Sequence, residues 1–127
     1  MKNRLFISIG LFLFAIAVGV YSFFYVVKTT DKVSDTIVSL QKHVVSGDYS
    51  KVSDESKNLD DMWRKSHHIL EIFIHHEALE NVDQSLSIIS TSIDKECWDD
   101  FWSESARAKS QIENLHDSEN PSIGNIL

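Results

Sequence analysis

The chain has 127 residues, a formal net charge of −7, four glycines and one proline. A chain of this length holds one small domain, and so few turn-forming residues exclude an all-β sandwich with its many corners. The acidic balance argues against nucleic acid as a partner, because phosphate contacts require clustered Lys and Arg. We therefore expect an all-α protein with a single folded domain.

An uncharged apolar run, LFISIGLFLFAIAVGVYSFFYVV, occupies residues 5–27. As a helix it measures about 34 Å, enough to cross the roughly 30 Å hydrocarbon core of a bilayer with some tilt. Tyr21 and Tyr25 lie near its end, where an aromatic belt is expected. The run predicts a transmembrane anchor, with the lipid bilayer as the first partner.

A cleaved signal peptide is the alternative interpretation of the same run. Lys2 and Arg4 form a basic n-region, and Ala15-Ile16-Ala17 is an acceptable cleavage site. The apolar run nevertheless continues for ten residues beyond Ala17, where a secreted protein would have little use for it. An uncleaved anchor accounts for both halves of the run.

The charges that flank the run predict its orientation. Lys2 and Arg4 precede it, whereas Lys28 and Lys32 after it are partly offset by Asp31. This bias favours the N-terminus inside. We expect residues 1–4 in the cytoplasm, the span at 5–27 in the cytoplasmic membrane, and residues 28–127 outside it.

Beyond the span, four apolar stripes at helical spacing predict four amphipathic helices. The first continues the anchor through Val33, Ile37, Leu40 and Val44, and "SGDYS" at 46–50 supplies a left-handed Gly47 and a capping residue for the next helix. The second, about 49–74, and the third, about 77–93, meet near residue 76. The stripes of the last three helices are Val52, Leu59, Trp63, Leu70 and Phe73; Leu79, Val82, Leu86, Ile89 and Ile93; and Trp98, Phe101, Trp102, Ser105, Ala108, Ile112 and Leu115.

These stripes predict a small antiparallel four-helix bundle over residues 28–117, whose first helix is the outward extension of the transmembrane helix. A tail at 118–127 follows, with a helix-ending Pro121 and an apolar finish. The only cysteine, Cys97, forbids an internal disulfide. We expect it to be a buried small hydrophobe, with an exposed or intermolecular thiol as the alternative.

The stretch HHILEIFIHHE at residues 67–77 contains four of the six histidines and raises the question of a metal site. His67, Glu71 and His75 follow each other one turn apart, so two of them could share an ion. On a helical wheel these side chains flank or oppose the core stripe, and no HExxH or CxxC motif completes a site. We interpret the cluster as solvated or helix-terminal side chains, with a metal site or a pH-responsive surface as alternatives.

Catalytic motifs are absent from the sequence. The adjacent pairs Asp60-Asp61 and Asp99-Asp100 point about 100° apart on a helix and cannot act on one atom. No serine stands in a GxSxG turn, and no glycine-rich loop could cradle a phosphate. We expect no enzyme activity and no cofactor.

The order of these features resembles a bacterial family of uncharacterised proteins, domain of unknown function family 4363 (DUF4363). The resemblance covers almost the full chain, and its more specific parts are HHEALENVDQSL at 75–86 and NPSIGNIL at 120–127. It implies a small membrane-anchored helical protein of Gram-positive bacteria without an established activity. Some members are encoded beside membrane proteins of another uncharacterised family, which implies a membrane-protein partner.

The residues that match the family pattern are Trp63, His76, Glu77, Asn81, Asp83 and Ser85. This chain has His75-His76 in place of an Asp-His pair, so a role of that aspartate does not carry over. We expect a non-catalytic single-pass protein that binds a partner, with a ligand-binding or metal-sensing module as the alternative. The sequence sets no oligomeric state. The candidate partner-binding residues are His76, Glu77, Asn81, Ile126 and Leu127.

Overall fold

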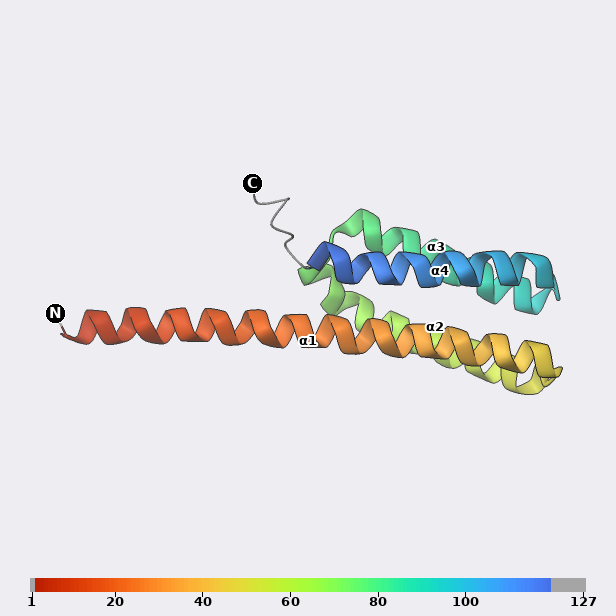
Figure 1. Cartoon of the computed structure of the whole chain (residues 1–127), viewed down its shortest axis with the longest axis horizontal. Coiled ribbons are helices and arrows are strands. Elements are labelled where there is room, and N and C mark those ends of the chain that lie inside the picture. Colours follow the sequence, from red (N-terminus) through yellow and green to blue (C-terminus); the bar gives the residue numbers. More distant parts are fainter. Residues whose placement is uncertain (1, 120–127) are drawn as a thin grey trace.

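The structure, a computed structural model that describes residues 2–119 and side chains as far as Leu115, contains four α-helices in this part of the chain. They are α1 (Lys2–Ser46), α2 (Tyr49–Phe73), α3 (His76–Asp94) and α4 (Trp98–Glu119). Successive helices run antiparallel, and α4 returns to pack against α1 (Figure 1). The predicted all-α four-helix bundle is confirmed. The predicted tail residues Ile126 and Leu127 lie outside the described residues.

The first helix is one unbroken rod of 45 residues, about 68 Å long, and its two halves have different surroundings. Every described residue from Lys2 to Tyr21 is exposed, and this half projects from the bundle (Figure 1). It is the one candidate membrane span among the described residues, long and apolar enough to cross a bilayer. The second half, which begins at Ser22, is part of the bundle.

Near the C-terminal end of the apolar run, α1 already packs against the other helices. Ser22 and Val26 are 7% and 0% exposed, so the other helices already cover one face of α1 at this level. Hydropathy cannot distinguish burial against protein from burial in lipid, which is why the sequence assigned these residues wholly to the span. The hydroxyl of Ser22 donates to the Val18 carbonyl at 2.7 Å and is thereby satisfied.

The connection between α1 and α2 confirms the turn predicted from "SGDYS". Gly47 has φ +77° and donates to the Val44 carbonyl, while the Asp48 N–H donates to the His43 carbonyl. This is a Schellman arrangement, in which glycine avoids the clash of a left-handed residue with its own Cβ. The carboxylate of Asp48 then caps α2 by accepting from the Lys51 N–H.

The connection between α3 and α4 repeats the same hydrogen bonds without a glycine. The Cys97 N–H donates to the Ser92 carbonyl and the Glu96 N–H to the Ile93 carbonyl. Glu96 occupies the left-handed position, with φ +56°. Cys97 is exposed, so the expectation that it is buried was wrong. It precedes α4 by one residue, outside the stripe that begins to face the core at Phe101.

The core is built from the predicted stripes. Among the described side chains, eighteen buried apolar residues, from all four helices and from Ile74 between α2 and α3, form one cluster, in which Phe101 is the largest fully buried side chain. Trp102 does not belong to it and is 39% exposed. Its position is about 100° from Phe101 around α4, so it lies at the edge of the stripe. Phe73 and Trp98 are partly buried.

Polar side chains also join each pair of neighbouring helices. Ser39 of α1 donates to Glu55 of α2 at 2.9 Å, and Gln41 of α1 donates to Ser105 of α4 at 3.0 Å. Ser85 of α3 donates to Gln111 of α4 at 2.7 Å. Because such bonds form only when the helices are correctly aligned along their axes, they select one register of the bundle. The fourth pair, α2 with α3, is joined by Trp63 and His67 of α2, which both contact the carboxylate of Asp83 of α3.

Candidate functional site: a polar groove between α2 and α3

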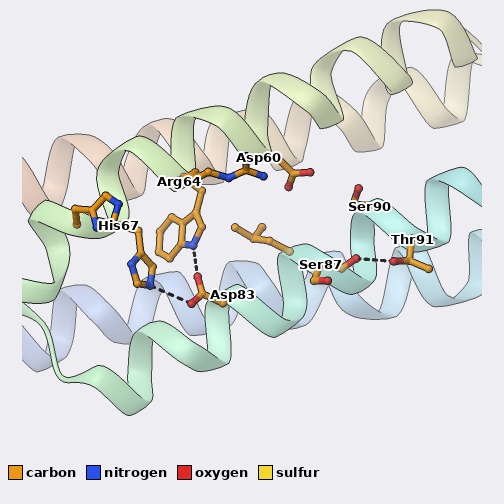
Figure 2. Close-up of a pocket in the computed structure, with 10 residues that line it drawn as sticks. Asp60, Arg64, His67, Asp83, Ser87, Ser90 and Thr91 are labelled. Atoms are coloured by element: carbon orange, nitrogen blue, oxygen red, sulfur yellow. Dashed lines mark hydrogen bonds and ion pairs between the residues drawn. The ribbon is translucent and has the colours of Figure 1, made fainter.

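A groove of about 360 Å³ lies between α2 and α3. Asp60, Arg64 and His67 line it from α2, and Asp83, Ser87 and Ser90 line it from α3 (Figure 2). It combines carboxylates, a guanidinium, an imidazole and hydroxyls over an apolar floor of Trp63 and Leu86. Such a mixture of apolar surface and a few polar groups is typical of binding sites for small ligands and for peptide side chains.

Asp83 is at one end of the groove and receives two side chains of α2. Its Oδ1 accepts the indole N–H of Trp63, and its Oδ2 lies 3.0 Å from Nε2 of His67. Trp63 is only 6% exposed, so its N–H would be left without a partner if Asp83 were absent. The carboxylate therefore holds two helices together and orients both rings.

His67 has a carboxylate at each ring nitrogen. Nδ1 lies 3.1 Å from Glu71, one turn further along α2, and Nε2 faces Asp83 of α3 (Figure 2 shows the latter pair). Only the protonated imidazolium can donate to both carboxylates at once. Because both nitrogens are engaged, neither is free to ligate a metal in this arrangement.

Asp60 lies at the other end of the groove, beside Arg64 (Figure 2). Burial raises the pKa of its carboxyl above the ordinary value of 3.8, because desolvation penalises the charged form. A hydrogen bond with Ser90 and the charge of Arg64 act in the opposite direction but do not cancel the effect of burial. The groove therefore holds a carboxylate that is partly desolvated at neutral pH.

Of the three metal candidates, His67 and Glu71 lie in contact at 3.1 Å, but His75 does not join them. His67 lies at the flank of the core stripe, as the helical wheel predicts, but it is half-buried against α3 and not solvated as the cluster was interpreted. His75 is exposed at the start of α3, where its Nδ1 accepts the Glu77 N–H at 3.2 Å as the N-cap. Between residues 2 and 115, no three His, Cys, Asp or Glu side chains are grouped so that they could hold a metal ion.

The described partner-binding candidates lie on the first two turns of α3. His76, Glu77 and Asn81 are exposed, and His76 Nε2 lies 3.0 Å from the carboxylate of Glu80. This end of α3 is the end of the bundle from which the apolar half of α1 emerges (Figure 1). These residues are thus accessible to another molecule at that end of the bundle.

The groove itself was not predicted from the sequence. Asp60, Arg64 and Ser90 were not expected to lie together, since they come from two helices with about 30 residues between them. One signal was present: Trp63 and His67 are one turn apart on α2, so their polar atoms face the same neighbour. The helix that supplies their common acceptor could not be identified from α2 alone.

Comparison with known proteins identifies a family. A family model described as "Domain of unknown function (DUF4363)" matches residues 20–126. The match includes the bundle-forming half of α1, all of the groove and the candidate residues at the start of α3. No curated protein and no solved structure gives a match.

Proposed function

The chain belongs to the DUF4363 family, and we propose that it is a non-catalytic single-pass membrane protein whose bundle binds a membrane-protein partner. In this proposal the first half of α1 crosses the cytoplasmic membrane with its N-terminus inside. The four-helix bundle lies outside, close to the outer leaflet.

The exposed apolar half of α1 supports membrane anchoring. Large side chains such as Phe6, Phe12 and Phe14 are more than 65% exposed. Each would cost about 1.5–3 kcal/mol to leave in water instead of an apolar environment, so the projecting half requires cover. Lipid supplies that cover along its full circumference. Lys2 and Arg4 at one end and the mixed charges of Asp31 and Lys32 at the other favour the proposed orientation.

The position of the exposed residues of α3 is the observation that carries the partner proposal. His76, Glu77 and Asn81 are at the membrane end of the bundle, on a surface that the other helices leave open. A partner that binds there must itself lie at or in the membrane. A rigid α1 contributes to binding, since it holds this surface at a constant distance from the membrane and so reduces the entropy lost on association.

Site-specific photocrosslinking in native membranes tests this proposal. A benzoylphenylalanine at Asn81 should give one dominant adduct with a membrane protein, in an amount that approaches one partner per chain. The matched control is the same photoreactive residue at Asp99, which is exposed at the opposite end of the bundle. If crosslinking from Asn81 were no stronger than crosslinking from Asp99, the result would count against partner binding at this surface.

The groove between α2 and α3 favours a second candidate function, a binding module for a small polar ligand. Arg64 offers a cation for a carboxylate or phosphate, and Ser87 and Ser90 offer hydroxyls on the opposite wall. A ligand that occupies the groove should raise the melting temperature of the chain, by an amount that grows with the logarithm of its concentration relative to its Kd. Arg64→Gln should abolish that rise, whereas Lys109→Gln on α4, away from the groove, should retain it.

A further inference from the structure

We propose that the corner between α2 and α3 inserts into the outer interface of the bilayer, with Ile69 and Ile72 in contact with lipid. The corner comprises residues 69–75, which are the last turn of α2 and the two residues that connect it to α3. This inference rests on the proposed anchoring by α1 and adds a second contact with the same membrane.

The length of the exposed span indicates that the membrane reaches the bundle. The apolar residues of α1 that no other helix covers, 5–21, form a helix of about 26 Å, shorter than the roughly 30 Å of a bilayer core. Phe23 and Phe24 follow, at 38% and 64% exposure, with Phe23 at the flank of the covered face of α1 and Phe24 on the side that faces away from the bundle. To cover these two rings, lipid must rise above Ser22, where the bundle begins.

The connection between α2 and α3 is the part of the bundle that meets this level of α1. Figure 1 shows the α2–α3 connection beside the place where α1 leaves the bundle, and the burial of Val26 agrees with this. A lipid surface that covers Phe24 therefore also reaches the last turn of α2. The corner must then be compatible with an apolar environment.

The exposed side chains of the corner include two isoleucines beside the polar Glu71 and His75, a mixture that suits the interface of a bilayer and not its core. Ile72 is 74% exposed and Ile69 is 41% exposed, and the two lie about 60° apart around α2 on one face. The remaining large apolar residue of α2 with comparable exposure, Tyr49, is at the opposite end of the helix. Glu71 between them points to another face, where it pairs with His67.

Basic residues lie farther from the centre of the bilayer than the corner does, at the level expected for lipid phosphates. Lys65 is two turns before Ile72 on α2, and it lines a groove together with Lys32 of α1. Lys28 is one turn below Lys32 and is exposed. Asp61 lines the same groove and reduces the local positive charge. Apolar side chains below and lysines above are the usual pattern of an interfacial helix end.

Fluorescence of single labelled cysteines in vesicles tests the insertion. The full chain, with Cys97→Ser, carries NBD at one position and is reconstituted in phosphatidylcholine and phosphatidylglycerol, with or without brominated phosphatidylcholine. The test position is Ile72→Cys. Ser50→Cys, exposed at the other end of the same helix, is the matched control, and Phe12→Cys reports on the span.

The proposal predicts blue-shifted emission and bromine quenching at Phe12→Cys and Ile72→Cys, with neither effect at Ser50→Cys. Quenching at Phe12→Cys but not at Ile72→Cys would overturn the insertion of the corner and leave the anchor in place. Quenching at none of the three positions would instead overturn anchoring by α1, and the inference with it.

Discussion

Asp83 of α3 accepts the indole N–H of Trp63 of α2, which makes one carboxylate responsible for the alignment of two helices. The second oxygen of the same carboxylate faces His67 at 3.0 Å. Trp63 is part of the hydrophobic core, so this polar contact lies at the boundary between the core and the groove. A contact of this kind affects both stability and the shape of the groove.

Removal of the carboxylate should destabilise the chain measurably. Asp83→Ala leaves the buried N–H of Trp63 unpaired, and we expect a loss of about 1–3 kcal/mol in the free energy of unfolding, measured by urea denaturation in detergent. Asp35→Ala, an exposed aspartate of α1, should change it by less than about 0.5 kcal/mol. In the background of Trp63→Phe, which has no N–H, Asp83→Ala should cost less. Equal costs in both backgrounds would show that the pair does not interact.

The raised pKa of Asp60 predicts how stability depends on pH. Above its folded pKa this carboxyl is charged and partly desolvated, which destabilises the folded state. Asp60→Asn should therefore be more stable than the natural chain at pH 7. As the pH falls through the raised folded pKa, the folded natural chain binds a proton, and the difference in stability between the two chains narrows. This difference is lost below the unfolded pKa of 3.8.

Thermal unfolding of both chains from pH 3 to pH 8 measures this difference. The paired curves should meet at low pH and diverge toward neutrality. A natural chain that is more stable than Asp60→Asn at pH 7 would mean that Arg64 and Ser90 stabilise the charged form more than burial destabilises it.

The two left-handed positions of the bundle should respond to substitution with opposite signs. No atom lies within 4 Å of a Cβ built on Gly47, so Gly47→Ala introduces only backbone strain, worth about 1 kcal/mol of lost stability. Glu96 already carries that strain at φ +56°. Glu96→Gly should therefore stabilise by roughly 0.5 kcal/mol. Both changes are measurable by urea denaturation, and destabilisation by Glu96→Gly would contradict the assignment of strain.

The boundary between the projecting and the bundled half of α1 can be tested by truncation. Deletion of residues 1–21 removes no described residue that is buried and should leave the melting temperature of the bundle nearly unchanged. Deletion of residues 1–27 also removes Val26, which is fully buried, and should cost about 1.5–3 kcal/mol. Equal melting temperatures for the two truncated chains would place the start of the bundle later than Ser22.

The helices could be predicted from the sequence because the apolar stripe of a helix depends only on the spacing of apolar residues within that helix. Leu79, Val82, Leu86, Ile89 and Ile93 of α3 were all expected in the core, and all are buried. The capping roles of Gly47 and Asp48 were likewise local and were predicted correctly. Cys97 was misjudged because its exposure depends on the path of the connection between α3 and α4.

The groove could not be predicted in the same way, because its chemistry arises between helices. The wheel of α2 placed His67 at the flank of the core stripe, which is where it lies. It could not show that Asp83 of α3 faces that flank and pairs with His67. The same limit applies to Ser22 and Val26, whose apolar context suited the membrane as well as the bundle.

The accessibility of Cys97 in intact cells tests the central claim most directly. It is the single cysteine of the chain and is exposed at the end of the bundle farthest from the span. A membrane-impermeant maleimide should label it without lysis, whereas Asn3→Cys in a Cys97→Ser background should react only after permeabilisation. Labelling of Asn3→Cys in intact cells, with Cys97 protected until lysis, would contradict a bundle outside the membrane.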